Sequence, residues 1–193
     1  MKNRFILSLL FLLLFGTIPY SCNYFQRTRL KAENAKNANK IISLMFEASS
    51  LSDSTAMQAY SDSCVTFLKT CPENEKDSIK SAVYSFIVFW KKFETDMVTS
   101  IQKDAKLDTL TLFTPAILQE IQVMCNKCGE DYRNFKSQLC IAVVNTQENL
   151  ERIKGMNNPE FTTTWFGNNL QTIYQRNDSI NHVIFNRMFE GKN

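Results

Sequence analysis

The sequence contains little glycine, proline and histidine. Only 5 glycines and 4 prolines occur among 193 residues, while 44% of the residues are hydrophobic and 12% are aromatic. Disordered chains show the opposite balance, because a chain with few apolar side chains cannot bury enough surface to offset the entropy lost on folding. The composition therefore excludes disorder and predicts an ordered globular protein with its own core.

Histidine occurs once, at position 182, and this scarcity excludes several metal centres. A zinc site takes about four Cys or His ligands in close pairs, and the usual di-iron bundle needs Glu-x-x-His, which is absent. Haem attachment after Cys125 and Cys128 would need a histidine where Gly129 stands. Nucleophile elbows, phosphate loops and zinc-protease helices are missing too. We therefore expect no enzyme activity, no cofactor and no metal.

A strong excess of charge is also missing. The formal net charge is +3, and removal of residues 1–21 would leave +1, because Lys2 and Arg4 are the only charged residues there. Nucleic-acid binding is therefore not expected. Basic residues gather only between 27 and 40, where Glu33 is the one acid. We interpret this stretch as a solvated tether, and contact with anionic lipid headgroups is the alternative.

No apolar run reaches the ~20 residues that span a bilayer. The run from Phe5 to Phe15 has about 11 residues and follows Lys2 and Arg4. A basic start before a short apolar run is typical of a signal peptide. The run is followed by Ser21-Cys22, at the place where a processing enzyme would cut.

The Ser21-Cys22 junction resembles the lipobox of bacterial lipoproteins, in the looser form found in Bacteroidota. The resemblance covers residues 1–22 and implies that Cys22 carries an acyl lipid such as palmitate, becomes the new N-terminus and holds the protein at a membrane. Residues 23–27 contain no acid that resembles a surface-export tag, which favours a periplasm-facing position in the cell envelope. Ordinary secretion and an uncleaved membrane anchor are the alternatives.

Helical spacing of apolar residues dominates the rest of the chain. We expect helices at about 30–48, from a cap at Ser52 or Asp53 to Cys71, and at about 73–104. The helix at about 73–104 carries a stripe of apolar residues that recur every three or four positions. We therefore expect this helix to form the centre of the core, with Trp90 largely buried. The stripe comprises Ile79, Val83, Phe86, Trp90, Phe93, Met97 and Ile101.

The C-terminal half predicts two more long helices. One begins at Thr114-Pro115, as a cap followed by proline at the first helical position, and runs to Lys154 unless Gly129 breaks it. The other begins at Asn158-Pro159, and residues 167–169 are a possible break within it. Residues 107–113 are expected to form a loop. We predict an all-α fold, an elongated antiparallel bundle of four or five long helices. Its domains are a signal peptide at 1–21, a lipidated tether at 22–38 and one bundle at 39–193.

Five cysteines follow Cys22, so an oxidising envelope allows at most two disulfides among them. Cys125 and Cys128 have the spacing of a redox motif, but they lie well inside a predicted helix, where the dipole gives the first thiol no help. We expect them not to bond to each other. The candidate bridge crosses helices, from Cys64 or Cys71 to Cys125 or Cys128.

Aromatic residues give the only positive indication of function. The sequence has 15 Phe, 6 Tyr and 2 Trp, more than a slim bundle easily hides, and exposed aromatic side chains mark interfaces. Phe161, Trp165 and Phe166 are the candidates. We expect a non-enzymatic envelope protein that binds another envelope protein. The alternative is a carrier of a small ligand or metal, or a thiol-redox protein, with a pocket between helices lined by Phe86, Trp90, Met124 and Cys128.

Overall fold

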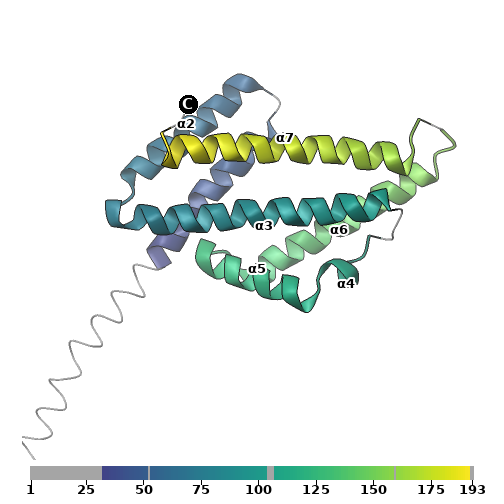
Figure 1. Ribbon diagram of the computed structural model, residues 1–193, viewed down its shortest axis with the longest axis horizontal. Coiled ribbons are helices and arrows are strands. Elements are labelled where there is room, and N and C mark those ends of the chain that lie inside the picture. Colours follow the sequence, from purple (N-terminus) through teal and green to yellow (C-terminus); the bar gives the residue numbers. More distant parts are fainter. Residues whose placement is uncertain (1–31, 52, 104–106, 159, 192–193) are drawn as a thin grey trace, which may run out of the picture. The chain divides into compact units, whose positions relative to one another are not determined.

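The computed structural model describes residues 32–51, 53–103, 107–158 and 160–191 (Figure 1). The signal peptide, Cys22 and most of the tether lie outside these residues. Residues 35–193 form one compact unit, which is the bundle described below. The residues that the structure describes contain helices and no strand.

The helices follow the predicted order, and the all-α class is confirmed. They are a first helix at residues 32–50, α2 (Ser54–Thr70), a short 3-10 turn η1 (Glu73–Glu75), α3 (Lys76–Gln102), α4 (Thr109–Leu112), α5 (Pro115–Cys128), α6 (Tyr132–Lys154) and α7 (Thr163–Phe189).

Side-chain caps explain where several of these helices begin. The Asp53 carboxylate accepts a hydrogen bond from the backbone N–H of Thr55, and the Thr114 hydroxyl accepts one from Ile117. Such caps satisfy backbone donors that have no partner inside the helix. The predicted caps at Asp53 and at Thr114-Pro115 are both confirmed.

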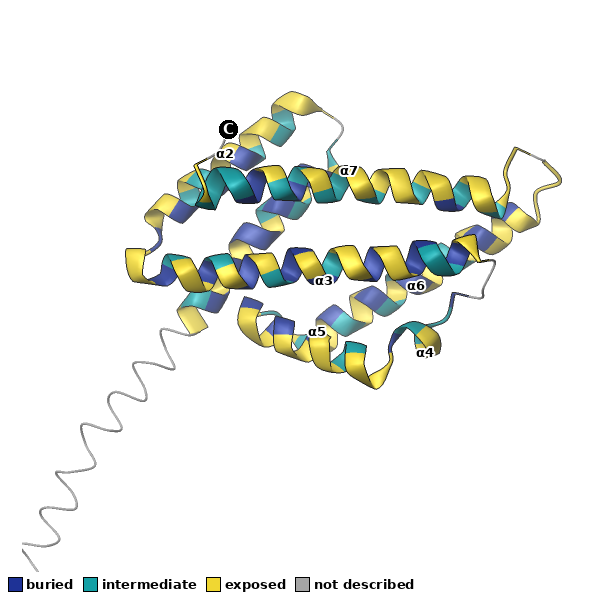
Figure 2. Cartoon of the chain, viewed as in Figure 1, coloured by how far each residue is buried: buried dark blue, intermediate teal, exposed yellow. Residues whose placement is uncertain are grey.

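α3 is the central helix, as its stripe predicted. It packs most extensively against α7 and next against α5 (Figure 1), and its buried residues line its inner side (Figure 2). Phe86 and Phe93 are buried, whereas Trp90 is only partly buried and packs against the ring of Phe46 at 5.0 Å between centroids. Trp90 therefore packs against the core, as expected, with part of its side chain at the surface.

Paired residues give the directions of the helices. α3 and α7 are antiparallel, because Gln102 bonds to Gln171 at one end and Lys91 bonds to Asp178 near the middle. α3 and α5 are also antiparallel. α2 is parallel to α7, because Arg176 contacts Met57 and Arg187 pairs with Asp62. The bundle of long helices is confirmed, but it is not antiparallel throughout.

Gly129 does break the long C-terminal helix. It adopts φ 71° and ψ 19° directly after α5, and α6 starts at Tyr132 after the Asp131 cap. A left-handed residue ends a helix because its N–H turns back to a carbonyl of the last turn, and glycine adopts this conformation without strain. An unbroken helix from 115 to 154 is therefore wrong, and the break folds α6 back towards α5 (Figure 1).

Three other boundaries differ from the predictions. α7 begins at Thr163, after a cap from the Thr162 hydroxyl, and runs through Gly167 without interruption. Gly167 is buried against Gln102 and Ile101, so its missing side chain serves close packing rather than a break. Residues 109–112 form one helical turn, capped by Asp108, instead of a loop. The first helix already includes residues 32–38, which had been assigned to the tether, and Ala35 and Ala38 are buried.

Candidate functional site

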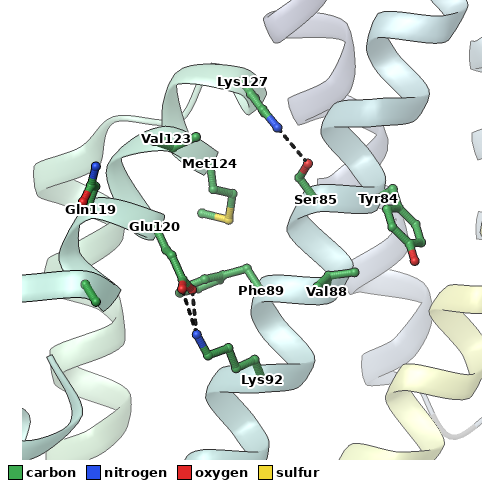
Figure 3. A pocket seen from close by; sticks show the side chains of 11 residues that line it. Tyr84, Ser85, Val88, Phe89, Lys92, Gln119, Glu120, Val123, Met124 and Lys127 are labelled. Atoms are coloured by element: carbon green, nitrogen blue, oxygen red, sulfur yellow. Dashed lines mark hydrogen bonds and ion pairs between the residues drawn. The ribbon is translucent and has the colours of Figure 1, made fainter. Parts of the chain in front are cut away.

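An open groove runs between α3 and α5 (Figure 3). Its volume is about 550 Å³. The lining comes from the central part of α3 and most of α5, and comprises Tyr84, Ser85, Val88, Phe89, Lys92, Ala116, Gln119, Glu120, Val123, Met124 and Lys127.

The centre of the groove is apolar. Phe89 and Met124 are buried in the core between the two helices, and Val88 and Val123 stand above them, 47% and 49% exposed. Tyr84 also lines the groove and is 52% exposed, and its ring packs against that of Phe185 on α7, with centroids 5.6 Å apart. Single exposed apolar residues are ordinary, but neighbouring ones that line one hollow mark a binding surface.

Polar bridges cross the groove at both ends. Near one end the Lys92 ammonium lies 2.9 Å from both carboxylate oxygens of Glu120, and near the other Lys127 donates to the Ser85 hydroxyl at 3.3 Å (Figure 3). The Lys92–Glu120 pair is about half exposed and contributes at most about 1 kcal/mol to stability. Lys127 has a neutral partner there, so the groove carries one uncompensated positive charge.

The amphipathic spacing of α5 produces this groove. Ile121, Met124, Cys125 and Cys128 are buried against the core, as steps of three and four residues dictate. Val123 lies off that stripe, and Val88 lies off the stripe of α3. Apolar residues outside the buried stripes are therefore the sequence feature from which this groove could have been predicted. Ile87 and Phe89 also lie off the α3 stripe, but they are buried, whereas Val88 between them is exposed.

The predicted interface aromatics lie at the start of α7 and in the turn before it. The Phe161 and Trp165 rings contact each other, with centroids 4.9 Å apart, and are 37% and 43% exposed. Phe166 is only partly exposed. The structure thus brings Phe161 and Trp165 together on the surface and turns Phe166 partly inwards.

The cysteines between α2 and α6 all carry free thiols. Cys125 and Cys128 are fully buried at the C-terminal end of α5, and the Cys128 Sγ lies 3.5 Å from the Ala82 carbonyl oxygen. Burial raises the pKa of Cys128 to about 12 and that of Cys125 to about 11. A thiolate is the reactive form, and a helix C-terminus disfavours it, so this pair has the opposite setting to a redox motif.

Cys64 and Cys71, the predicted bridge partners, are buried and unpaired as well. Desolvation raises the pKa of Cys64 to about 12, and it also raises the pKa of Cys71. A bridge from either residue to Cys125 or Cys128 stays a prediction.

The predicted ligand pocket between helices is filled by side chains. Phe86 and Trp90 stack at 6.2 Å between ring centroids, and the space beside them has a volume of about 10 Å³, enough for at most one water molecule. Met124 instead lines the α3–α5 groove, and Cys128 is buried. Within the described ranges, no three His, Cys, Asp or Glu side chains cluster as metal ligands would.

Comparison of the chain with protein-family models, with curated proteins and with solved structures finds no match. None of the helices in the described part of the chain is both long and apolar enough to cross a membrane.

Proposed function

We propose that this protein is a non-enzymatic, lipid-anchored protein of the bacterial cell envelope that binds another envelope protein through the α3–α5 groove. The observation that carries the proposal is the exposed apolar wall of that groove, formed by Val88, Val123 and Tyr84. Protein interfaces combine such an apolar centre with a polar rim. Here Lys92, Glu120 and Lys127 supply the rim.

The occupant we propose is an amphipathic helix of the partner protein. Lys92 lies seven positions after Ser85 on α3, so the two polar bridges stand about 10 Å apart at 1.5 Å per residue. Two turns of a helix place two or three apolar side chains on one face over that length. The uncompensated charge of Lys127 favours an acidic residue on the partner, next to its apolar face.

A small apolar ligand is the second candidate. The groove volume of about 550 Å³ lies within the range of small-molecule sites. The small volume left inside the core argues against a ligand between the helices, so a carrier function would also have to use this surface.

Placing a charge in the groove should abolish partner binding. We expect Val88→Lys to weaken binding at least tenfold, because the new ammonium would be desolvated under the partner helix, while the fold tolerates a residue that is already half exposed. Val144→Lys on α6 is the matched control, since Val144 is also 47% exposed. A photo-crosslinking residue at position 123 identifies the partner in cells, and binding of the purified partner is then titrated.

The crosslink experiment also decides between occupants. The proposal requires an adduct whose crosslinked segment is an apolar helix with an acidic residue, and it requires Lys127→Glu to weaken binding. Equal binding by Val88→Lys and Val144→Lys would contradict it. So would an adduct with a second copy of this chain or with a small molecule alone.

Membrane attachment should depend on Cys22. We expect mass spectrometry of the membrane fraction to find a mature chain that begins at Cys22 and carries an acyl lipid. Cys22→Ala should move the protein to the soluble fraction or block its maturation, whereas Cys140→Ala should leave it at the membrane. An unmodified N-terminus, or unchanged membrane association of Cys22→Ala, would contradict the lipoprotein assignment.

A further inference from the structure

A second hollow lies between α3 and α7, away from the lining of the groove. Its volume is about 350 Å³, and most of the residues that line it have a polar group. The residues that line it are Lys91, Glu94, Thr95, Val98, Thr99, Gln102, Gln171, Tyr174, Gln175 and Asp178. Hydrogen bonds from Gln102 to Gln171 and from Lys91 to Asp178 join the two helices around it, at 3.1 and 2.7 Å.

Glu94 is the unusual residue of this hollow, because it is only 5% exposed. Its Oε1 accepts a hydrogen bond from the Trp90 indole N–H at 2.7 Å, and the other carboxyl oxygen has no hydrogen-bond partner among the described residues. Buried carboxylates are almost always paired with a cation. The nearby ammonium of Lys91 binds Asp178 instead.

Asp178, on the facing helix α7, also has an unsatisfied carboxylate oxygen. The Oδ1 atom of Asp178, which lines the hollow, is buried and makes no hydrogen bond within the described part of the chain. The Oδ1 atom of Asn181 is also buried without a hydrogen bond, but Asn181 lines the small space beside Phe86 and Trp90 and not this hollow. His182 Nδ1 lies 3.2 Å from the Asp178 oxygen, which it can neutralise only when the imidazole is protonated. Among the described residues, Glu94 and Asp178 thus each have a carboxylate oxygen that no hydrogen bond satisfies, and the N–H groups of a ligand would supply the missing donors.

The charges around Glu94 also indicate that the hollow lacks a cation besides Lys91. Burial is the main cause that raises the pKa of Glu94 to about 7, and the negative charge of Asp178 raises it further, against the hydrogen bond from Trp90. Burial and then the charge of Glu94 raise the pKa of Tyr174 to about 12. With both carboxylates ionised and Lys91 charged, the hollow carries one negative charge without a counterion.

We propose that the α3–α7 hollow binds one cationic nitrogen group, an ammonium or a guanidinium, with Glu94 as its counterion. The ring of Tyr174 provides an aromatic wall of the kind that attracts cations. Gln102, Gln171 and the threonine hydroxyls supply neutral acceptors for the remaining N–H groups. The cation comes either from a free small amine or from a Lys or Arg side chain of another protein.

Proton release should accompany binding. A cation beside Glu94 favours its ionised form and lowers its pKa, so a proton leaves when the cation enters. Below the pKa of the free pocket, affinity should rise by up to about tenfold per pH unit and then level off above it. A cation that binds away from Glu94 would release no such proton.

Calorimetry with small probes tests the proposal on the full chain. The probes are butylammonium, methylguanidinium and their neutral counterparts butanol and methylurea, each titrated in two buffers of different ionisation enthalpy. We expect the cations alone to bind, with proton release near neutral pH. Glu94→Gln should weaken cation binding at least tenfold, while Glu120→Gln, which removes an acid outside the hollow, should not change it.

The source of the cation is decided by a further pair of probes. A capped tripeptide with a central arginine is compared with methylguanidinium, and its citrulline counterpart is the neutral control. Tighter binding of the tripeptide assigns the site to a protein side chain, and tighter binding of methylguanidinium assigns it to a small molecule.

The results that would overturn this proposal do not depend on the proposal for the α3–α5 groove. No heat from either cation, or equal binding by wild type and Glu94→Gln, would overturn the proposal. Circular dichroism of Glu94→Gln checks that the variant is folded. Val88→Lys should leave cation binding unchanged, so the proposal for this hollow and the proposal for the α3–α5 groove fail separately.

Discussion

Gly129→Ala should lower the free energy of unfolding by about 2–4 kcal/mol. Two costs add at this position. A residue with a side chain loses about 1–2 kcal/mol in the left-handed conformation that Gly129 adopts at φ 71°. A Cβ built there would also lie 2.9 Å from the carbonyl carbon of Ala35 and 3.0 Å from its oxygen. These are backbone atoms, so the first helix itself would have to move away from the α5–α6 turn.

Gly155→Ala is the matched control for this prediction. Gly155 also ends a helix, but its φ is −75° and a Cβ there would lie 3.5 Å from the nearest atom, an ordinary contact. The change should be neutral or slightly stabilising, because alanine restricts the unfolded chain more than glycine does. Urea unfolding followed by far-UV circular dichroism measures both variants.

Gly129→Asn separates the two costs. Asparagine tolerates the left-handed conformation better than alanine but carries the same Cβ. If the close approach to Ala35 contributes, Gly129→Asn remains well below wild type in stability. A loss of less than about 0.5 kcal/mol for Gly129→Ala, the range of ordinary surface substitutions, would contradict the packing of the first helix on this turn.

The helix positions were predictable because local chemistry determines them. Asp53 and Thr114-Pro115 are caps that act within one turn, and the α3 stripe requires only a period of three and four residues. Gly129 was recognised as a position where the helix either continues or breaks. The sequence could not decide between them, because the deciding contact, with Ala35, comes from a helix about ninety residues earlier.

The candidate sites were less predictable, because they depend on which helices become neighbours. Phe161 and Trp165 were recognised as interface candidates from aromatic excess alone. Val88 and Val123 line one groove only because α3 and α5 pack antiparallel, and their separation in sequence gives no sign of it. Glu94 follows the stripe residue Phe93 in the sequence, and nothing in the spacing marks it as buried. Glu94 is buried because the Trp90 indole bonds to its carboxyl and because α7 covers it. The bond to Trp90 lies within one turn of α3, whereas the contact with α7 depends on the tertiary fold.

Glu94 should make the protein less stable as the pH rises from about 5 to about 8. Its pKa is 4.5 in the unfolded chain and about 7 in the folded protein. Between these values the folded state binds more protons than the unfolded state, so the free energy of unfolding falls with increasing pH. The stabilisation by the protonated carboxyl is complete below about pH 4.5 and is lost by the time the pH exceeds about 7.

Glu94→Gln isolates this contribution, because glutamine keeps the size of the side chain and an oxygen that accepts from the Trp90 indole. Each pKa unit corresponds to about 1.4 kcal/mol, so the variant should be more stable than wild type by roughly 3 kcal/mol near pH 8 and about equal to it near pH 4. The difference between the two proteins cancels the contributions of Lys91, Asp178, Tyr174 and His182 to first order.

Urea unfolding at a series of pH values measures the difference, with Glu120→Gln as the control for loss of an exposed carboxylate. The control should differ from wild type by no more than about 1 kcal/mol at any pH, because an exposed ion pair contributes little. Saturating butylammonium should restore the stability of wild type near pH 8 without affecting Glu94→Gln, because a ligand stabilises only the state that binds it. Parallel curves for wild type and Glu94→Gln across this range would show that Glu94 ionises at an ordinary pKa, and that the folded protein already supplies the counterion that we assign to a ligand.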